Sequence, residues 1–337
     1  MSETEPFISV IVPTRNRIDW LRRCLEGIAE QDYSDYEVMV VDDGSAADVI
    51  TAYEAMMVEF GSHYHLIKAN GAENRRLGPS VIRNIGIAES RGTYIAFCDD
   101  DDYWCKSDLL SVAADCLKKT NLNLYFSNQK ILHNDEVVSN TSFKHVQATL
   151  GEGQRLDNQK VYNITRKQIL SFPDYAHLNI TIAKKSLLKS VGGFWEETRY
   201  AEDVDLFVRL CSATDRVLFR PEVCSAHNAP VKHDRESASK IIGDVNRRLL
   251  ENSVYWHLLA SCQTPEAIKY ASLSLASNSK LLTQELVAKK SYKAAAAVAR
   301  MAFGVKPSVK WGLYTAMLSV KAVFIRSKIE HHGFTHG

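Results

Sequence analysis

The sequence lacks several features that would place it in a specialised class of protein. It has no run of about eighteen uncharged apolar residues, so we expect no membrane-spanning helix. The opening segment MSETEPF is acidic and has no apolar core, so we expect no signal peptide. The seven cysteines are odd in number and show no framework spacing, which favours a reduced, cytoplasmic location over a disulfide-stabilised secreted one.

Two common nucleotide-binding motifs are also missing. G-x-G-x-x-G does not follow the first predicted strand, and G-x-x-x-x-G-K-[ST] occurs nowhere. Their absence argues against a dinucleotide-binding fold and against a P-loop. The remaining composition is that of an ordinary globular protein, with 337 residues of which 45% are hydrophobic and 24% are charged. This length suggests about two structural units.

The net charge of +1 conceals an asymmetry. Residues 280–337 hold ten Lys or Arg against two Glu, whereas the preceding residues hold 31 basic and 38 acidic side chains. The larger, acidic part should repel nucleic acid, so no nucleic-acid partner is expected for it. In the basic part, Met317, Leu318 and Phe324 recur near helical spacing beside Lys321. Such a helix can lie on a membrane surface or pack within a helical unit or a homo-oligomer.

Strand and helix patterns alternate over the first hundred residues. Short apolar runs predict strands at 8–12, 36–41, 64–68 and 93–98. Between them, residues such as Ile18, Leu21 and Leu25 recur at helical spacing. This alternation is typical of an α/β fold with a parallel sheet covered by helices.

The pattern is less regular further along the chain. Additional strands are predicted at 122–126, 178–183 and 216–219, and residues 134–160 are polar and hard to assign. After about residue 235 every segment has a helical pattern. We therefore expect one domain over 1–235 and a helical C-terminal region over 236–337.

Polar clusters follow the predicted strands at 13–17, 42–45 and 99–102. Ligands of open parallel sheets bind beyond the carboxyl ends of the strands. The cluster at 99–102 is four consecutive aspartates, which repel one another and call for a positive partner. Their oxygens suit Mg²⁺ or Mn²⁺. The alternative is a solvated acidic turn that caps the helix predicted near Ser107.

A fourth cluster begins a later helix. Glu202, Asp203 and Asp205 precede an apolar face, and acids at a helix N-terminus are favourable on electrostatic grounds alone. The segment Gly192–Trp195 just upstream combines glycine with aromatic residues. Such a loop could shape a pocket for a sugar or an acceptor.

Taken in order and spacing, these segments resemble glycosyltransferase family 2 enzymes of the GT-A fold over roughly residues 7–235. The matching segments are ISVIVPTRNR (8–17), VDDGS (41–45), GPSVIRNIGI (78–87), YIAFCDDDDYW (94–104) and VGGFWEETRYAEDVDLFVRL (191–210). The resemblance implies a mostly parallel GT-A sheet with flanking helices. It also implies metal-dependent, inverting transfer of one sugar from a nucleotide-diphosphate donor, with UDP as the expected nucleotide.

The resemblance further implies a glycan or lipid-linked glycan acceptor, in surface polysaccharide or lipopolysaccharide biosynthesis. It suggests a cytoplasmic enzyme that is peripheral on the inner face of the membrane. The departure from the family pattern is small, since Lys106 stands where a proline is common.

Donor-binding roles carry over to Pro13, Thr14, Arg15, Asp42, Asp43, Arg83, Asp99 and Asp100. Asp43 would bond the base, and Arg83 would approach the diphosphate or the donor sugar. The family's Asp-x-Asp motif maps onto Asp99 and Asp101, with Asp101 as the direct ligand of Mn²⁺ or Mg²⁺. The neighbouring Asp100 and Asp102 leave this assignment ambiguous.

The same resemblance makes Asp203 the catalytic base, in a pair with Glu202. Glu202 and Trp195 would line the acceptor or sugar pocket. Trp104 could also stack on a sugar or the base, and core packing is the equal alternative for it. A histidine after the last predicted strand would return to the metal, and His233 is preferred to His227.

Two other functions stay open at this point. A sugar nucleotidyltransferase would normally carry a glycine- and lysine-rich signature near the first strand, which PTRNR lacks. A nucleotide-sugar-binding protein without catalysis is the other alternative, and the presence of both Asp101 and Asp203 argues against it.

Overall fold

The computed structural model describes residues 5–69, 76–156, 160–229 and 243–332, with side chains up to residue 324. The chain divides into two compact units, Met1–Val231 and Lys232–Gly337.

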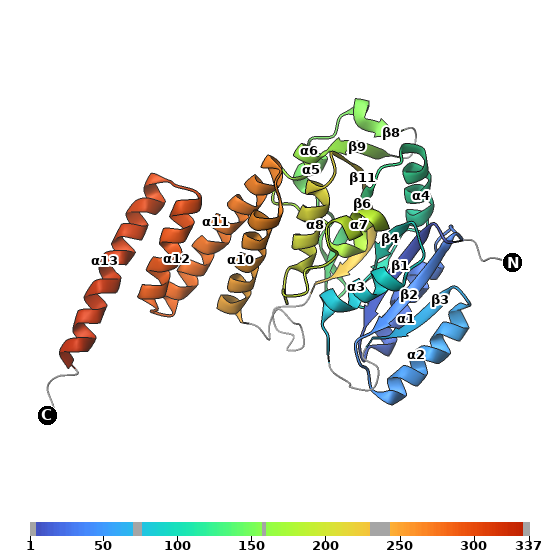
Figure 1. The fold of residues 1–337 in the computed structure, drawn as a ribbon, viewed down its shortest axis with the longest axis horizontal. Helices are drawn as coiled ribbons and strands as arrows, with labels where there is room; N and C mark the ends of the chain where they lie inside the picture. The colour runs from blue at the N-terminus through green and yellow to red at the C-terminus, as the bar shows by residue number, and fades with distance from the viewer. Residues whose placement is uncertain (1–4, 70–75, 157–159, 230–242, 333–337) are drawn as a thin grey trace. The chain divides into compact units, whose positions relative to one another are not determined.

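The first unit is built on a single mixed sheet of eleven strands (Figure 1). The strands are β1 (Ile8–Thr14), β2 (Tyr36–Asp42), β3 (Tyr64–Lys68), β4 (Tyr94–Phe97), β5 (Tyr103–Trp104), β6 (Leu124–His133), β7 (Glu136–Ser139), β8 (Arg155–Leu156), β9 (Val161–Thr165), β10 (Thr181–Lys184) and β11 (Arg216–Asn228). Their order is β3-β2-β1-β4-β10-β6-β11-β9-β8, with β5 paired to β11 and β7 to β6. The pairs among β1–β4 and the pair β6–β11 are parallel.

Helices flank this sheet, as the alternating pattern predicted. They are α1 (Ile18–Ala29), α2 (Ala47–Phe60), α3 (Pro79–Glu89), α4 (Leu109–Thr120), α5 (Lys144–Gln147), α6 (Arg166–Ile169), α7 (Lys185–Ser190) and α8 (Glu202–Ser212), with 3-10 turns η1 (Glu152–Gln154) and η3 (Leu178–Ile180). The apolar spacing of α1 puts Leu21, Leu25 and Ile28 into the core against the sheet. Pro79 opens α3 at its first turn.

The middle of the chain differs in detail from the expectation. The strand predicted at 216–219 runs on to residue 228 as β11, and that predicted at 122–126 runs on to 133 as β6. The strand predicted at 178–183 begins as the turn η3, and β10 then pairs antiparallel with β4 and β6. These extensions were not visible in the sequence because polar residues interrupt the apolar runs, and a cross-strand partner decides whether such a segment is a strand.

Helix α3 lies close to β1, and a glycine permits this approach. A Cβ atom on Gly86 would lie 2.7 Å from Cγ2 of Ile11 and 3.2 Å from Cγ2 of Val41. These distances are shorter than ordinary van der Waals contact, so only glycine allows α3 this depth. The close packing brings Arg83, on the same helix, to the edge where β1, β2 and β4 end.

The loop before α8 is fixed to α3 by one side chain. The amide of Asn84 accepts a hydrogen bond from the backbone N–H of Phe194 (2.8 Å) and donates one to its carbonyl (3.0 Å). Gly193, with a φ of +68°, passes so close that a Cβ atom there would lie 2.5 Å from Oδ1 of Asn84. This clamp sets the path of the chain toward Glu202 and Asp203.

The second unit consists of helices α10 (Asp244–Ser261), α11 (Pro265–Ala288), α12 (Tyr292–Val305) and α13 (Val309–His332) over its described residues. Consecutive helices contact one another along the chain. Alanines make the close contact in α12, where Ala296 and Ala299 pack with Leu318 of α13. Among the described helices, none has the length and apolar character needed to cross a bilayer.

Gly192 and Gly193 before α8 offer a matched test of the contact between Asn84 and this loop. Gly192→Ala introduces a side chain at a φ of +79° with open space around it, whereas Gly193→Ala adds a clash with Asn84. We expect Gly192→Ala to cost about 1–2 kcal/mol of unfolding free energy and Gly193→Ala about 1–3 kcal/mol more. Urea unfolding of the two variants measures the difference, and equal losses would show that Asn84 does not constrain the loop.

Candidate active site

The loops after β1 and β2 are tied together at the carboxyl edge of the sheet. The N–H of Asn16 donates to Oγ of Ser45 (2.8 Å), and Oδ1 of Asn16 accepts from the N–H of Ala46 (2.9 Å). Asp42 folds its own loop, because its carboxylate accepts from the N–H groups of Gly44 and Ser45. The first two predicted polar clusters therefore form one continuous rim.

Asp43 holds the segment that leads into α3. Its two carboxylate oxygens accept from the backbone N–H of Leu77 (2.7 Å) and of Gly78 (3.1 Å), and Arg76 approaches to 3.8 Å. The predicted bond from Asp43 to a nucleotide base stays a prediction. In this structure the carboxylate positions the N-terminus of α3.

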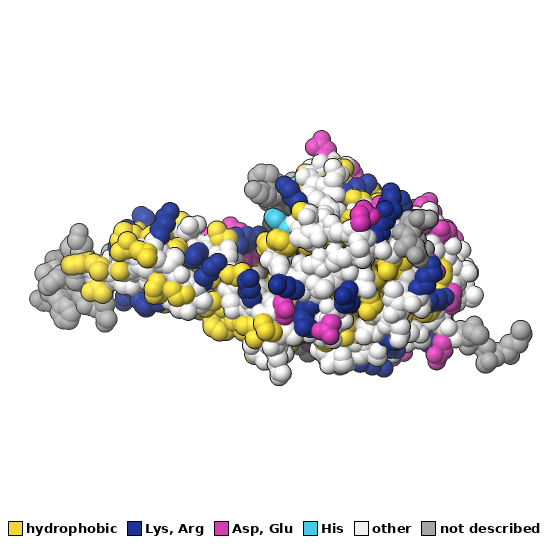
Figure 2. All heavy atoms as spheres, turned by 90° about the horizontal axis from the view of Figure 1, so that it is seen from above, with side chains coloured by type: hydrophobic (Ala, Val, Ile, Leu, Met, Phe, Trp, Pro, Cys, Tyr) yellow, Lys and Arg dark blue, Asp and Glu magenta, His cyan; other side chains and the backbone are white. Residues whose placement is uncertain are grey.

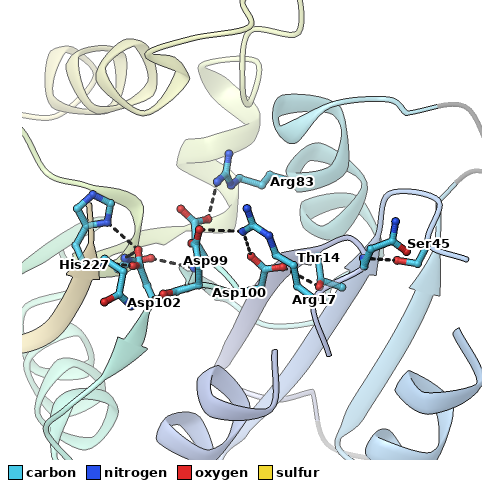
Figure 3. Close-up of polar contacts among 12 residues, drawn as sticks. Thr14, Arg17, Ser45, Arg83, Asp99, Asp100, Asp102 and His227 are labelled. Carbon is cyan, nitrogen blue, oxygen red and sulfur yellow. Dashed lines mark hydrogen bonds and ion pairs between the residues drawn. The ribbon is translucent and has the colours of Figure 1, made fainter. Parts of the chain in front are cut away.

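Three of the four consecutive aspartates point to different partners (Figure 3). Asp99 pairs with Arg83 (2.5 Å), and Asp100 accepts from Thr14 and from Arg17 (2.8 Å each). Asp102 accepts from the N–H of Asn228 (2.6 Å). Arg17 and Arg83 of the protein itself thus supply positive charge that reduces the repulsion among the aspartates.

Arg83 links the aspartate run to the start of α8. It is buried, and its guanidinium contacts Asp99 and also Glu202 (3.0 Å). Burial works against the charge of Asp99, but Arg83 outweighs it, so the pKa of Asp99 is lowered. Asp99 therefore stays ionised beside a buried cation that also contacts Glu202, at the place where the resemblance expects a diphosphate.

Arg17 is a site residue to which sequence reasoning gave no role of its own. Its guanidinium bridges Asp100 and Asp101 at 2.8 and 2.9 Å, and its side chain is 44% exposed. Partial burial and the neighbouring carboxylates of Asp102 and Asp100 nevertheless raise the pKa of Asp101 to about 7. The rim retains excess negative charge even with Arg17 in place.

Asp102, His177 and His227 form a separate cluster. One ligand atom from each lies within 4.8 Å of the others. The rings of the two histidines are 4.2 Å apart, and Nδ1 of His227 lies 2.9 Å from Oδ2 of Asp102. Among the described residues, Nδ1 of His177 is buried and has no hydrogen-bond partner. A carboxylate with two imidazoles is a donor set that divalent transition ions accept.

The two histidines have opposite electrostatic surroundings. Burial and the nearby His227 lower the pKa of His177 to about 4, so its imidazole is neutral at pH 7. Burial also opposes the charge of His227, but Asp102 outweighs it and raises the pKa of His227 to about 9. A neutral imidazole is the form that binds a metal, and a bound cation would replace the proton of His227. The cluster therefore fits a divalent ion.

The cluster contains none of the preferred metal ligands Asp101, Asp99 and His233, although it does contain Asp102 and His227, which were their alternatives. Asp101 contacts Arg17, and one oxygen of Asp99 contacts Arg83 while the other lies 3.8 Å from Nε2 of His177. His233 lies outside the described residues. Asn179, which donates to Asp102 through its amide and accepts from the N–H of Asp99, holds the turn between these groups.

Asp203 lies at the N-terminus of α8. Its Oδ1 accepts from the N–H of Val204 (2.8 Å). Ala201 just before the helix has a φ of +58°, an unfavourable conformation for a residue with a side chain, and such conformations cluster at functional sites. Burial, with Glu202 adding to it, raises the pKa of Asp203 to about 7. A carboxylate with this pKa can accept a proton near neutral pH.

The remaining predicted residues border this rim in different ways. Pro13 is half-buried at the end of β1, and Nε of Arg15 donates to the carbonyl of Gly44 (3.4 Å). Trp195 is half-buried in the clamped loop, consistent with either a pocket or a packing role. Trp104 is buried, and its indole donates to the carbonyl of Asn179, which bears out the packing alternative.

Sequence reasoning missed His177 and Asn179. Both lie at or directly before the start of the strand predicted at 178–183, and neither belongs to a motif that the resemblance supplied. Their position follows from the pairing of β10 between β4 and β6, which places η3 next to the aspartate run.

Comparison with known proteins finds proteins that are similar to the first unit. Residues 9–170 match the model of "Glycosyl transferase family 2". GalNAc(5)-diNAcBac-PP-undecaprenol beta-1,3-glucosyltransferase of Campylobacter jejuni is 30% identical over 151 residues, covering 41% of this chain and 47% of the relative. The putative teichuronic acid biosynthesis glycosyltransferase TuaG of Bacillus subtilis is 26% identical over 138 residues, covering 40% of this chain and 51% of the relative. The chain thus covers about half the length of these two curated relatives.

Solved structures share the fold. S. aureus TarS 1–349 in complex with UDP-GlcNAc superposes with a TM-score of 0.58 at 20% identity, covering 81% of this chain and 71% of that one. The mannosyltransferase PcManGT of Pyrobaculum calidifontis, in complex with GDP-Man and Mn²⁺, gives 0.57 at 18% identity, covering 95% and 88%. The predicted GT-A-type fold, with its additional C-terminal helical region, is confirmed.

Because the pKa of Asp203 is raised, we expect the free energy of unfolding to depend on pH through this residue. Since the folded protein favours the neutral form, stability from this group is present below about pH 4 and is lost as the pH rises through 7. Asp203→Asn keeps an oxygen for the N–H of Val204 and removes the charge. At pH 8 we expect this variant to be more stable than the wild type by on the order of 1–3 kcal/mol, with the gain vanishing below pH 5.

Thermal unfolding between pH 4 and pH 8 measures this difference. The exposed Glu197, on the same segment, supplies the control Glu197→Gln, whose effect should be small at every pH. A less stable Asp203→Asn protein at pH 8 would show instead that the fold favours the ionised carboxylate.

Proposed function

We propose that the protein transfers one sugar from a nucleotide-diphosphate donor to an acceptor hydroxyl, with inversion at the anomeric carbon, because residues 9–170 match the model of glycosyltransferase family 2. The observation that carries the proposal is the arrangement of Asp203, Glu202, Arg83 and Asp99. In this arrangement the buried Arg83 contacts Asp99 and Glu202, and Asp203, whose pKa is about 7, directly follows Glu202 in the chain. In this proposal residues 1–235 are the catalytic domain and 236–337 a helical accessory region.

The donor would lie along the rim formed by the loops after β1, β2 and β4. Thr14 and Arg15 are available for the nucleotide, with Asp42 and Asp43 shaping the loops around it. Arg17 and Arg83 present guanidinium groups, which match phosphate oxygens in geometry and charge. UDP is the nucleotide we favour, since TarS, which shares the fold, was solved with UDP-GlcNAc.

Asp203 would act as the general base. An alcohol is a weak nucleophile, so its proton must be taken up as the new bond to the anomeric carbon forms. The carboxylate of Asp203 accepts that proton while the bond to the diphosphate oxygen breaks on the opposite face of the sugar. One displacement inverts the configuration and needs no covalent intermediate. Trp195 and Glu202 would border the sugar or the acceptor.

A divalent cation fits beside this machinery. Asp102, His177 and His227 would hold it, with Asp101 and Asp99 as the carboxylates from the expected motif. Bound there, a divalent ion supplies charge neutralisation for the nucleoside diphosphate as it leaves. Two imidazoles favour Mn²⁺ over Mg²⁺, which prefers oxygen ligands alone.

For the acceptor we propose a glycan or a lipid-linked glycan, in the synthesis of surface polysaccharide or lipopolysaccharide. The supporting observation is that the relatives from Campylobacter and Bacillus are named for an undecaprenol-linked acceptor and for teichuronic acid. With an acceptor of this kind, the proposed location is the cytoplasm, peripheral on the inner face of the membrane.

Asp203→Asn is the test of the catalytic role. We expect release of UDP from a panel of UDP-sugars, with a glycan acceptor and Mn²⁺, to fall by roughly 10²–10⁴-fold while UDP binding stays within about threefold. In the wild type, kcat/KM should rise with pH through about 7, since only the ionised carboxylate accepts a proton.

Glu197→Gln is again the control. A parallel loss of UDP affinity would assign Asp203 to binding. Donor binding without any transfer would favour a non-catalytic nucleotide-sugar protein, and pyrophosphate release from UTP and a sugar phosphate would favour a nucleotidyltransferase.

The metal ligands are tested by binding of Mn²⁺ itself. We expect His177→Ala and His227→Ala each to weaken Mn²⁺ binding by about tenfold or more, measured by titration calorimetry or by the Mn²⁺ resonance signal. His133→Ala, a histidine of β6 outside the cluster, should bind normally. If Asp101→Asn alone weakens binding and both cluster variants bind as the wild type does, the ion is held by the Asp-x-Asp motif without the histidines.

A further inference from the structure

Helix α13 has two apolar faces, and one of them packs within the second unit. Leu318 is 1% exposed and contacts Ala296 and Ala299 of α12. The indole of Trp311 donates to the carbonyl of Ala299 (2.9 Å). This inner face also includes Ala322, and its members recur every three or four residues.

The other face of α13 is apolar and exposed over its described residues. We call it the outer stripe, and it consists of Val309, Leu313, Met317, Val320 and Phe324. Their exposed fractions are 83%, 70%, 55%, 55% and 66%. Steps of four and three residues place these side chains along one side of the helix. An ordinary surface helix has charged residues in such positions, so a continuous apolar stripe indicates a binding surface.

The charge around the outer stripe has one sign. Lys310 and Lys321 lie on α13 itself, and residues 309–329 contain no Asp or Glu. Lys321 places its ammonium group 4.3 Å from the ring of Tyr292 on α12, which fixes it beside the helix pair. Figure 2 shows hydrophobic and basic side chains next to each other over the C-terminal helices on the face in view.

We propose that the outer stripe docks on the surface of an anionic lipid bilayer, with α13 lying along it. The apolar side chains enter the boundary between headgroups and acyl chains, and the lysines contact anionic headgroups. The binding mode is peripheral, because the described part of α13 is not apolar enough to span a bilayer. The inference extends the proposed location, but its test contains neither donor nor acceptor and so is independent of the transfer reaction.

A second copy of the chain is the competing occupant, and charge disfavours it. Stable helix pairs with a seam of this spacing carry opposite charges on its two flanks. Two copies of α13 joined through the outer stripe would bring lysines together with no acidic side chain on residues 309–329 to compensate. A lipid surface of negative charge removes that conflict.

Flotation of the full chain with vesicles tests the proposal. Vesicles of phosphatidylcholine with about 30% phosphatidylglycerol should bind the wild type at least tenfold more tightly than pure phosphatidylcholine, and 0.5 M salt should weaken this binding. Leu313→Glu with Val320→Glu should reduce binding at least tenfold. Ser277→Glu with Gln284→Glu, which alters charge equally at exposed positions of α11, is the matched control and should bind far better.

Circular dichroism and thermal unfolding confirm that the variants fold. Lys310→Gln with Lys321→Gln is a second, milder variant that should lose the preference for anionic vesicles. Equal flotation of the wild type and the outer-stripe variant would overturn the proposal, as would the absence of vesicle binding by the wild type. A dimer in solution that dissociates in the outer-stripe variant, without vesicle binding, would assign the surface to a second copy.

Discussion

The repulsion among consecutive carboxylates at the end of β4 organises the site. Two like charges about 5 Å apart repel by roughly 3 kcal/mol at an effective dielectric constant of 20, so four in a row require compensation. The structure supplies it by turning the side chains toward different elements. Asp99 pairs with Arg83 of α3, Asp100 with Arg17 after β1, and Asp102 with His227 of β11. The ion pairs that relieve the repulsion thereby connect α3, the loop after β1 and β11 to the end of β4.

These pairings explain why distant segments must be placed accurately. Arg83 contacts both Asp99 and Glu202, so α3 and α8 share one buried cation. Removing one partner of a buried ion pair is costly because it leaves an uncompensated charge. The depth of α3 depends on Gly86, and the path into α8 depends on the contact of Gly193 with Asn84. The glycines thus act on the site through the placement of α3 and of the loop before α8.

Much of this could be predicted from the sequence. The alternating apolar runs gave the parallel half of the sheet, and the polar segments after β1, β2 and β4 were expected to meet because parallel strands end at one edge. The need for positive charge near the aspartates was also visible. The source of that charge was not visible, because Arg83 and Glu202 are 119 positions apart in the chain and only the fold brings them into contact. His177 could not be found for the same reason, since it directly precedes η3, whose position depends on the antiparallel insertion of β10.

The raised pKa values of the acidic groups affect both the stability of the fold and the chemistry of the site. A protein selected for stability alone would leave Asp203 in water or give it a cation, whereas here burial beside Glu202 holds its pKa near 7. The same holds for Asp101, whose pKa stays at about 7 although Arg17 contacts it. Each carboxylate is less stable when ionised than it would be in water, and a positive ligand or a proton would relieve this. Excess negative charge raises the affinity of the rim for a cation and the affinity of Asp203, at the start of α8, for a proton.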